Sequence, residues 1–177
     1  PDVQQAINSG VAAGTILTGT VPKLASSGQI RIAFDGDAVL FSPASERIFQ
    51  HKGLEAFERY ERRKADIPME EGPFAKFLQT IAHIQSKFSD RDSSPIRTAL
   101  VTSRSAPAHE RAIKTLRQWG VRVDEAFFLG GVSKQEVLSA FGAHIFFDDQ
   151  AVHAEPASQF VPSAVVPYAD GQNPMRK

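Results

Sequence analysis

The octapeptide FDGDAVLF, residues 34–41, places two carboxylates, Asp35 and Asp37, where an apolar run, IRIAF at residues 30–34, ends. Side chains two positions apart on a strand point to the same side of a sheet, so both carboxylates would face one cavity. Like charges repel strongly there unless a cation lies between them. The pair therefore indicates a metal site, although an Asp-Gly turn in a surface hairpin would explain the same residues.

Length and composition indicate a single domain over residues 1–177, because the chain has room for one core but not for two large ones. The 20 basic residues balance the 20 acidic ones, which argues against a nucleic acid polymer as partner. The sequence contains no cysteine, which fits a reducing compartment and leads us to expect a cytoplasmic protein. Its apolar runs fall short of the roughly 20 residues that span a membrane, so we expect no membrane association.

Hydrophobic periodicity predicts an alternation of helices and strands. Helices are expected at residues 2–14, 45–63, 74–88, 108–119 and 134–141, the second of these as one or two amphipathic helices. Strands are expected at residues 29–34, 98–102, 123–129, 144–147 and 164–166, with a connector at 19–28 before the first. This alternation predicts an α/β fold with a doubly wound, Rossmann-like parallel sheet covered on both faces. Ligands of such sheets bind beyond the carboxyl ends of the strands.

Polar residues follow four of the predicted strands, and together they suit one site. In chain order they are Asp35 and Asp37, Thr102 and Ser103, Lys134, and Asp148 and Asp149. Two adjacent acids after the apolar residues 145–147 would be costly without a cation. Lys134 would lie at the positive end of a helix dipole, an unfavourable place that favours a functional role. Alone, Thr102 would be interpreted as a cap and Lys134 as a surface residue, so the prediction depends on the combination.

This combination resembles the haloacid dehalogenase superfamily of phosphotransferases, whose motifs are Asp-x-Asp, Thr or Ser, Lys, and a late acidic pair. The resemblance extends to the residues around these motifs, because the sequence is similar to the cytosolic 5'-nucleotidase I family over residues 2–168. The stretches that carry this resemblance are FDGDAVLF at 34–41, LVTSRSA at 100–106, KTLRQWG at 114–120 and HIFFDDQ at 144–150. In that family an N-terminal region precedes the catalytic unit. The resemblance therefore implies that this chain is the C-terminal catalytic half, in contact with that region and compatible with a homo-oligomer.

The resemblance implies a catalytic role for several residues. Asp35 would be the nucleophile that forms an aspartyl-phosphate. Asp37 would protonate the leaving ribose oxygen and then deprotonate the attacking water. Thr102 would donate a hydrogen bond to a phosphoryl oxygen, helped by the backbone N–H of Ser103 or of Gly36 and by the N-terminus of the helix that follows.

The resemblance also implies a Mg²⁺ site and a balancing cation. Asp149, one oxygen of Asp35 and the backbone carbonyl of Asp37 would hold Mg²⁺, which prefers oxygen ligands. Asp148 would either share the metal or lie behind it. Lys134 would balance the charge of Asp35 and of the phosphoryl group.

Other residues are weaker candidates for contact with a substrate. Arg104 directly follows the Thr102 motif and is expected to contact phosphate or ribose. Residues 45–71 are expected to form a small helical cap inserted after the first strand, which would exclude water and select the leaving group. Some aromatic side chains could stack on a base, but their spacing predicts core packing instead: Phe41, Phe49, Phe57 and Tyr60. His109 and His153 are weaker candidates still.

The expected function is a Mg²⁺-dependent 5'-nucleotidase that hydrolyses nucleoside 5'-monophosphates of the AMP, IMP or deoxynucleotide class. A phosphatase of another small phosphomonoester, such as a sugar phosphate, would use the same residues. A non-catalytic nucleotide-binding or receiver-like module is a third interpretation. Asp37 argues against it, because a phosphate acceptor needs no acid for a leaving group. A fourth is that this half folds but turns over substrate only with its N-terminal region.

Overall fold

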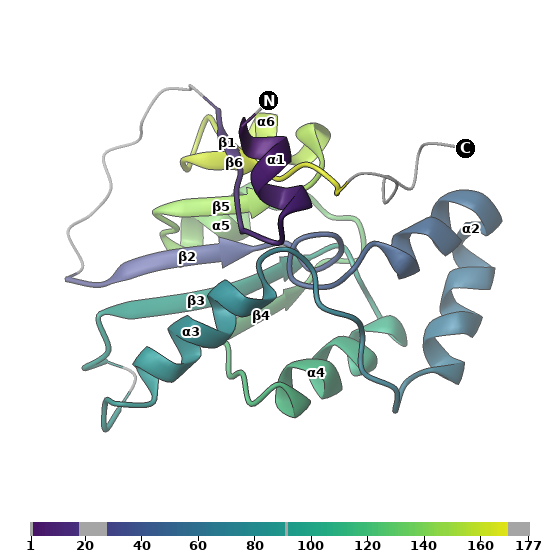
Figure 1. Ribbon diagram of the computed structural model, residues 1–177, viewed down its shortest axis with the longest axis horizontal. Coiled ribbons are helices and arrows are strands. Elements are labelled where there is room, and N and C mark those ends of the chain that lie inside the picture. Colours follow the sequence, from purple (N-terminus) through teal and green to yellow (C-terminus); the bar gives the residue numbers. More distant parts are fainter. Residues whose placement is uncertain (1, 18–27, 91, 170–177) are drawn as a thin grey trace.

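The computed structural model describes residues 2–17, 28–90 and 92–169 of the chain (Figure 1). The helices are α1 (Asp2–Asn8), α2 (Ala44–Arg63), α3 (Ala75–Gln85), α4 (Ala108–Gln118), α5 (Gln135–Phe141) and α6 (Ala151–Ala157). The strands are β1 (Thr15–Ile16), β2 (Ile30–Phe34), β3 (Ile96–Thr102), β4 (Glu125–Phe128), β5 (Ile145–Asp148) and β6 (Ser163–Val165). The predicted α/β fold and all five predicted strands are confirmed. The connector predicted at 19–28 lies outside the described residues except for Gly28.

The sheet has the strand order β1-β6-β5-β2-β3-β4, with β2 near its centre. Strand β2 pairs in parallel with β3 and β5, so that Phe34 lies opposite both Leu100 and Phe147. The chain continues from β2 to β3 and β4 on one side of the sheet and later returns to β5 and β6 on the other side. In sheets with such a change of direction, the crevice at the carboxyl ends of the central strands is the usual ligand site.

The prediction of a wholly parallel sheet is wrong at one edge. Strand β1 pairs with β6 in the antiparallel direction, with Thr15 opposite Val165. The helix predicted over residues 2–14 also ends early, at Asn8. Gly10 has φ 76°, a left-handed conformation that stops the helix and turns the chain toward the sheet edge.

Helices cover both faces of the sheet, as predicted (Figure 1). On one face, α1, α3 and α4 pack on a cluster that includes Phe34, Leu78 and Leu116. On the other face, α5 and α6 pack on a cluster that includes Val101 and Leu138. Each fully buried side chain of this size contributes about 1.5–3 kcal/mol, so the two clusters hold the strand ends in place.

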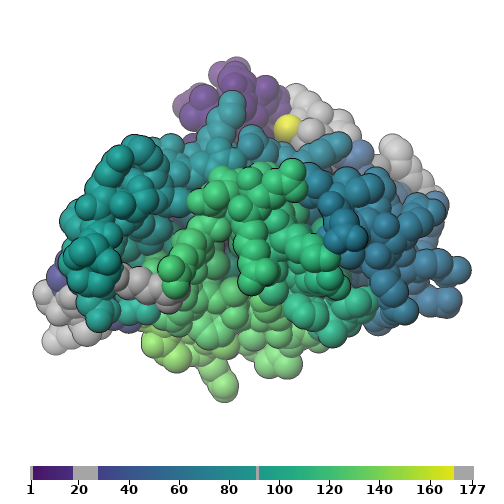
Figure 2. Space-filling model, turned by 90° about the horizontal axis from the view of Figure 1, so that it is seen from below, coloured from purple at the N-terminus to yellow at the C-terminus, as the bar shows by residue number. Residues whose placement is uncertain are grey.

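Helix α2 is the segment that departs from the layered core. It bends at Gly53, whose φ of 77° and ψ of 179° lie outside the helical region and suit glycine alone. In Figure 1 it stands beyond the carboxyl ends of β2 and β3, and in Figure 2 it lies next to α4. The prediction of one or two amphipathic helices at residues 45–63 is therefore confirmed as a kinked pair.

None of the helices in the described part of the chain combines the length and the apolar character that crossing a bilayer demands.

Candidate active site

The predicted strand-end residues meet at the carboxyl edge of the sheet. Asp35 directly follows β2, Thr102 is the last residue of β3, and Asp148 is the last residue of β5. Lys134 lies at the start of α5, in the connection that leads from β4 back to β5. Because β5, β2 and β3 are parallel neighbours, their ends converge and the side chains meet although they are far apart in sequence.

Lys134 is the cation at the centre of this cluster. Its Nζ donates to Asp35 Oδ1 and to Asp148 Oδ2, each at 2.7 Å. Burial disfavours the charged ammonium, but Asp35 and Asp148 outweigh that effect and raise the pKa of Lys134. The lysine therefore stays charged at every physiological pH.

The carboxylates are held in an environment that opposes their charge. Burial raises the pKa of Asp35 from its ordinary value of 3.8 to about 7, even though Lys134 lies beside it. Burial and the neighbouring charge of Asp35 likewise raise the pKa of Asp149 well above its ordinary value. Three acids thus share a single ammonium, an arrangement that a bound cation would stabilise.

Asp35, Asp148 and Asp149 each offer one oxygen atom to a common point, and those oxygens lie within 4.8 Å of one another. Asp148 uses both of its oxygens, because it accepts hydrogen bonds from Lys134 and from the backbone N–H of Gln150. Asp149 accepts one from the Tyr168 hydroxyl through Oδ2. Its Oδ1 is buried and has no hydrogen-bond partner among the described residues. Such an oxygen among hard donors fits a divalent cation, so the cluster can hold a metal ion.

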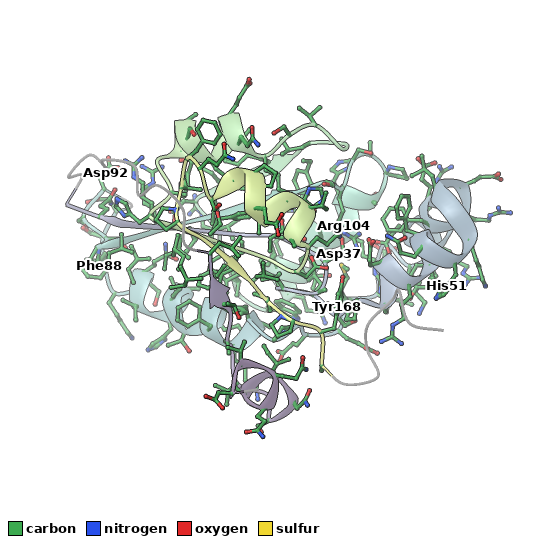
Figure 3. The ribbon with its side chains drawn as sticks, turned by 90° about the horizontal axis from the view of Figure 1, so that it is seen from above. Asp37, His51, Phe88, Asp92, Arg104 and Tyr168 are labelled. Atoms are coloured by element: carbon green, nitrogen blue, oxygen red, sulfur yellow. The ribbon has the colours of Figure 1, made fainter. Side chains whose placement is uncertain are left out.

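Asp37 lies at the same edge, but its carboxylate is turned toward Arg104. Arg104 donates from Nε to Asp37 Oδ2 and from Nη2 to Asp37 Oδ1, both at 2.7 Å. Figure 3 shows the two side chains together at the end of the sheet that faces α2, whereas the labelled Phe88 and Asp92 lie at the opposite end of the molecule. The predicted contact of Arg104 with phosphate or ribose stays a prediction.

Gly36 allows the loop after β2 to approach β3 closely. A Cβ atom added at Gly36 would lie 3.2 Å from Thr102 Oγ1, closer than an ordinary van der Waals contact. The Thr102 side chain is almost completely buried, whereas Ser103 is exposed and lines the cavity described next. A glycine at position 36 thus leaves the space in front of Asp35 and Thr102 free for a ligand.

A cavity of about 350 Å³ opens above this cluster. Its floor consists of the strand-end residues, and its outer wall is formed by Phe49, Leu54 and Phe57 of α2. Core packing is therefore the wrong prediction for Phe49 and Phe57, whereas Phe41 is fully buried against Trp119. The periodicity of a helix does not distinguish a face that packs on the sheet from one that overhangs it.

Polar side chains also line the cavity, and some of them were not predicted. Gln50 Nε2 donates to Glu46 Oε1 at 2.6 Å on the first turns of α2, and burial raises the pKa of Glu46. His153 also lines the cavity, where burial and Lys134 lower its pKa. His109 is not among the lining residues, because its ring packs on Phe128.

Glu61 and Tyr168 are the other site residues that sequence reasoning missed. Glu61 lies in the charged run of α2, which is most simply interpreted as solvated, yet only 1% of its surface is exposed. Tyr168 reaches Asp149 from the segment after β6. Only the tertiary fold reveals either role, because nothing in the local pattern separates Glu61 from its exposed neighbours.

Fold and site together define an α/β protein with an acidic, lysine-containing centre at the carboxyl edge of its sheet. The 5'-nucleotidase family model matches residues 1–173, and the chain belongs to this family. Human cytosolic 5'-nucleotidase 1B is 43% identical over 161 residues, which are 89% of this chain and 26% of that protein. The chain thus spans about a quarter of the length of this relative.

A chain in a solved Pnkp1/Rnl/Hen1 complex has a similar fold. The TM-score is 0.53 at 12% sequence identity, and the match covers 86% of this chain and 51% of that chain. At this identity the similarity concerns the fold alone.

Proposed function

We propose that this chain is the catalytic unit of a Mg²⁺-dependent 5'-nucleotidase of the haloacid dehalogenase type. Its substrates would be nucleoside 5'-monophosphates of the AMP, IMP or deoxynucleotide class. The single observation that carries the proposal is the buried cluster in which Lys134 contacts Asp35 and Asp148 at 2.7 Å, with Asp149 beside them. Membership of the 5'-nucleotidase family supports it.

The first step we propose is attack by Asp35 on the phosphorus atom. The oxygen that does not contact Lys134 would form the new bond to phosphorus, while the bond to the ribose oxygen breaks. Lys134 keeps the other Asp35 oxygen in place and offers positive charge to the phosphoryl group. The Thr102 hydroxyl and the backbone N–H groups of Gly36 and Ser103 would bind the phosphoryl oxygens.

Asp37 would provide the proton for the departing ribose oxygen. It would then take a proton from the water that hydrolyses the aspartyl-phosphate, so that phosphate leaves and Asp35 is restored. Asp35, Asp149 and the backbone carbonyl of Asp37 would hold Mg²⁺, with Asp148 behind them because both of its oxygens are engaged. When bound, the ion would neutralise charge on the phosphoryl group.

Residues 45–71, most of which lie in helix α2, would act as the predicted small cap. Phe49, Leu54 and Phe57 present an apolar wall that a nucleobase could contact, and the cavity volume of about 350 Å³ is in the range of small-molecule sites. A sugar phosphate would leave this wall without a partner, which favours a nucleotide as substrate. We also propose a cytoplasmic location, which the name of the human relative supports.

The test is phosphate release from a panel of 5'-nucleoside monophosphates and sugar phosphates in the presence of Mg²⁺, with Asp35→Asn as the blank. We expect turnover of nucleotides that disappears in the blank and in a chelator. Preference for sugar phosphates would refute the substrate class and leave the chemistry intact. Absence of turnover would indicate a binding module, or a unit that needs the remainder of a longer protein.

A further inference from the structure

Arg104 connects Asp37 to α2 through a buried chain of charges. Its Nη1 donates to Glu61 Oε2 at 2.6 Å, while Nε and Nη2 hold both oxygens of Asp37. Arg104 is 4% exposed and Glu61 is 1% exposed. Such an arrangement is costly to desolvate, so its presence next to a candidate catalytic acid requires an explanation beyond general stability.

The surroundings of Arg104 hold its guanidinium in one position. Nη1 also donates to the carbonyl oxygen of Ala108 at 3.3 Å, and the Phe57 ring lies 5.4 Å from the guanidinium carbon. Burial disfavours its charge, but Asp37 and Glu61 outweigh burial and raise its pKa. The group is thus a permanently charged, rigid fork that points at the carboxylate of Asp37.

We propose that Arg104, itself fixed by Glu61, is a positioning residue that sets the orientation of Asp37 toward the leaving-group oxygen. The inference rests on the proposed function, in which Asp37 gives a proton to that oxygen. Proton transfer requires the carboxyl group within about 2.6–3.2 Å of the oxygen, and Asp37 follows Gly36 in a loop rather than in a strand. A bidentate partner supplies the rotational constraint that the loop lacks, and because it occupies one lone pair on each Asp37 oxygen, the other lone pair of an oxygen stays open to the transferred proton. Glu61 extends the constraint to α2, which forms the outer wall of the cavity.

The dependence of the reaction rate on the leaving group distinguishes the positioning role of Arg104 from a purely structural one. A ribose alkoxide leaves slowly without a proton, whereas p-nitrophenolate leaves readily without one. The parameter kcat/KM covers the steps up to departure of the leaving group, so it isolates the acid role of Asp37. We therefore compare kcat/KM for a nucleoside monophosphate with kcat/KM for p-nitrophenyl phosphate.

Arg104→Lys keeps the charge but loses the two-pronged contact, and Glu61→Gln keeps the shape but loses the charge that fixes Arg104. We expect both variants to lower kcat/KM for the nucleotide about 10- to 100-fold. The value for p-nitrophenyl phosphate should change little, so that the ratio of the two falls about tenfold or more.

Arg111→Lys is the matched control. Arg111 is equally buried, donates to the same Glu61 at 3.0 Å and to the carbonyl oxygen of Ile67 at 2.8 Å, but does not contact Asp37. We expect this variant to lower the melting temperature and to leave the ratio unchanged.

An unchanged or increased ratio in Arg104→Lys would overturn the proposal, and so would an equal fall of the ratio in Arg111→Lys. If Arg104→Lys does not fold, Glu61→Gln decides by the same criterion. Absence of wild-type turnover of both esters would instead count against the proposed function of this chain on its own, and the inference would fall with it. A fall of the ratio confined to the Arg104 and Glu61 variants supports it.

Discussion

Asp35→Asn is expected to make the metal-free protein more stable at neutral pH, although it abolishes the proposed nucleophile. Burial raises the pKa of Asp35 from 3.8 to about 7 in the folded chain. Folding therefore favours the protonated carboxyl group. The stability that this group contributes is fully present below about pH 4 and is lost as the pH rises through about 7.

The magnitude follows from the difference between the two pKa values. At roughly 1.4 kcal/mol per pKa unit, a rise from 3.8 to about 7 corresponds to about 4 kcal/mol. Asparagine stays neutral at every pH and can still accept a hydrogen bond from Lys134. The variant should thus resemble the wild type near pH 4 and exceed its free energy of unfolding by up to about 4 kcal/mol at pH 8.

Urea unfolding in a chelator, at several pH values, measures this difference. The fluorescence of Trp119, the single tryptophan, reports unfolding because its ring packs on Phe41 with centroids 5.6 Å apart. Asp92→Asn makes the same substitution at an exposed position and serves as the control. Its free energy of unfolding should change with pH as that of the wild type does. Adding Mg²⁺ should raise the free energy of unfolding of the wild type more than that of Asp35→Asn. The reasoning is refuted if Asp35→Asn is no more stable relative to the wild type at pH 8 than at pH 4.

Three further predictions concern neighbouring residues. Lys134→Met removes the shared cation of two buried carboxylates and should cost about 3–5 kcal/mol at pH 8 and less at pH 5; equal losses in urea unfolding at both pH values would contradict this. Gly72→Ala would place a Cβ atom 2.5 Å from the main-chain oxygen of Phe41 and should lower stability by about 1–3 kcal/mol, seen as a lower melting temperature; an unchanged melting temperature would show that the loop yields freely. Tyr168→Phe frees an oxygen of Asp149 from its hydrogen bond and should weaken Mg²⁺ binding about 10-fold or more in calorimetry; unchanged affinity would exclude an orienting role for the hydroxyl.

The sequence predicted the parallel core of the sheet and the residues at the strand ends, because both depend on local signals. Apolar runs that end in acids locate Asp35 and Asp148, and glycine after a helical pattern locates the turn at Gly120. The short β1 was not predicted, since its two residues form a strand only through pairing with β6. Helix α6 was not predicted either, because it has seven residues and contains Pro156.

The cavity wall could not be predicted for a different reason. Phe49, Phe57 and Glu61 lie on an amphipathic helix whose pattern is the same whether it covers a sheet or extends past its edge. The bend at Gly53 and the pairing of Glu61 with Arg104 decide between these arrangements, and both depend on contacts distant in sequence. The charged sequence of α2 therefore gives no indication that Glu61 is buried.

The base of α2 is closed by a hydrogen bond from Ser45 Oγ to Glu61 Oε1 at 2.7 Å, between residues 16 positions apart and both buried. The chain therefore enters and leaves this segment at almost the same point. A segment tied off in this way can vary in length or sequence beyond its base with little effect on the strands that hold Asp35, the proposed nucleophile. If the proposed function holds, proteins that share this sheet could acquire new substrate preferences by exchanging residues 46–60 as a unit, provided that Ser45 and Glu61 are retained.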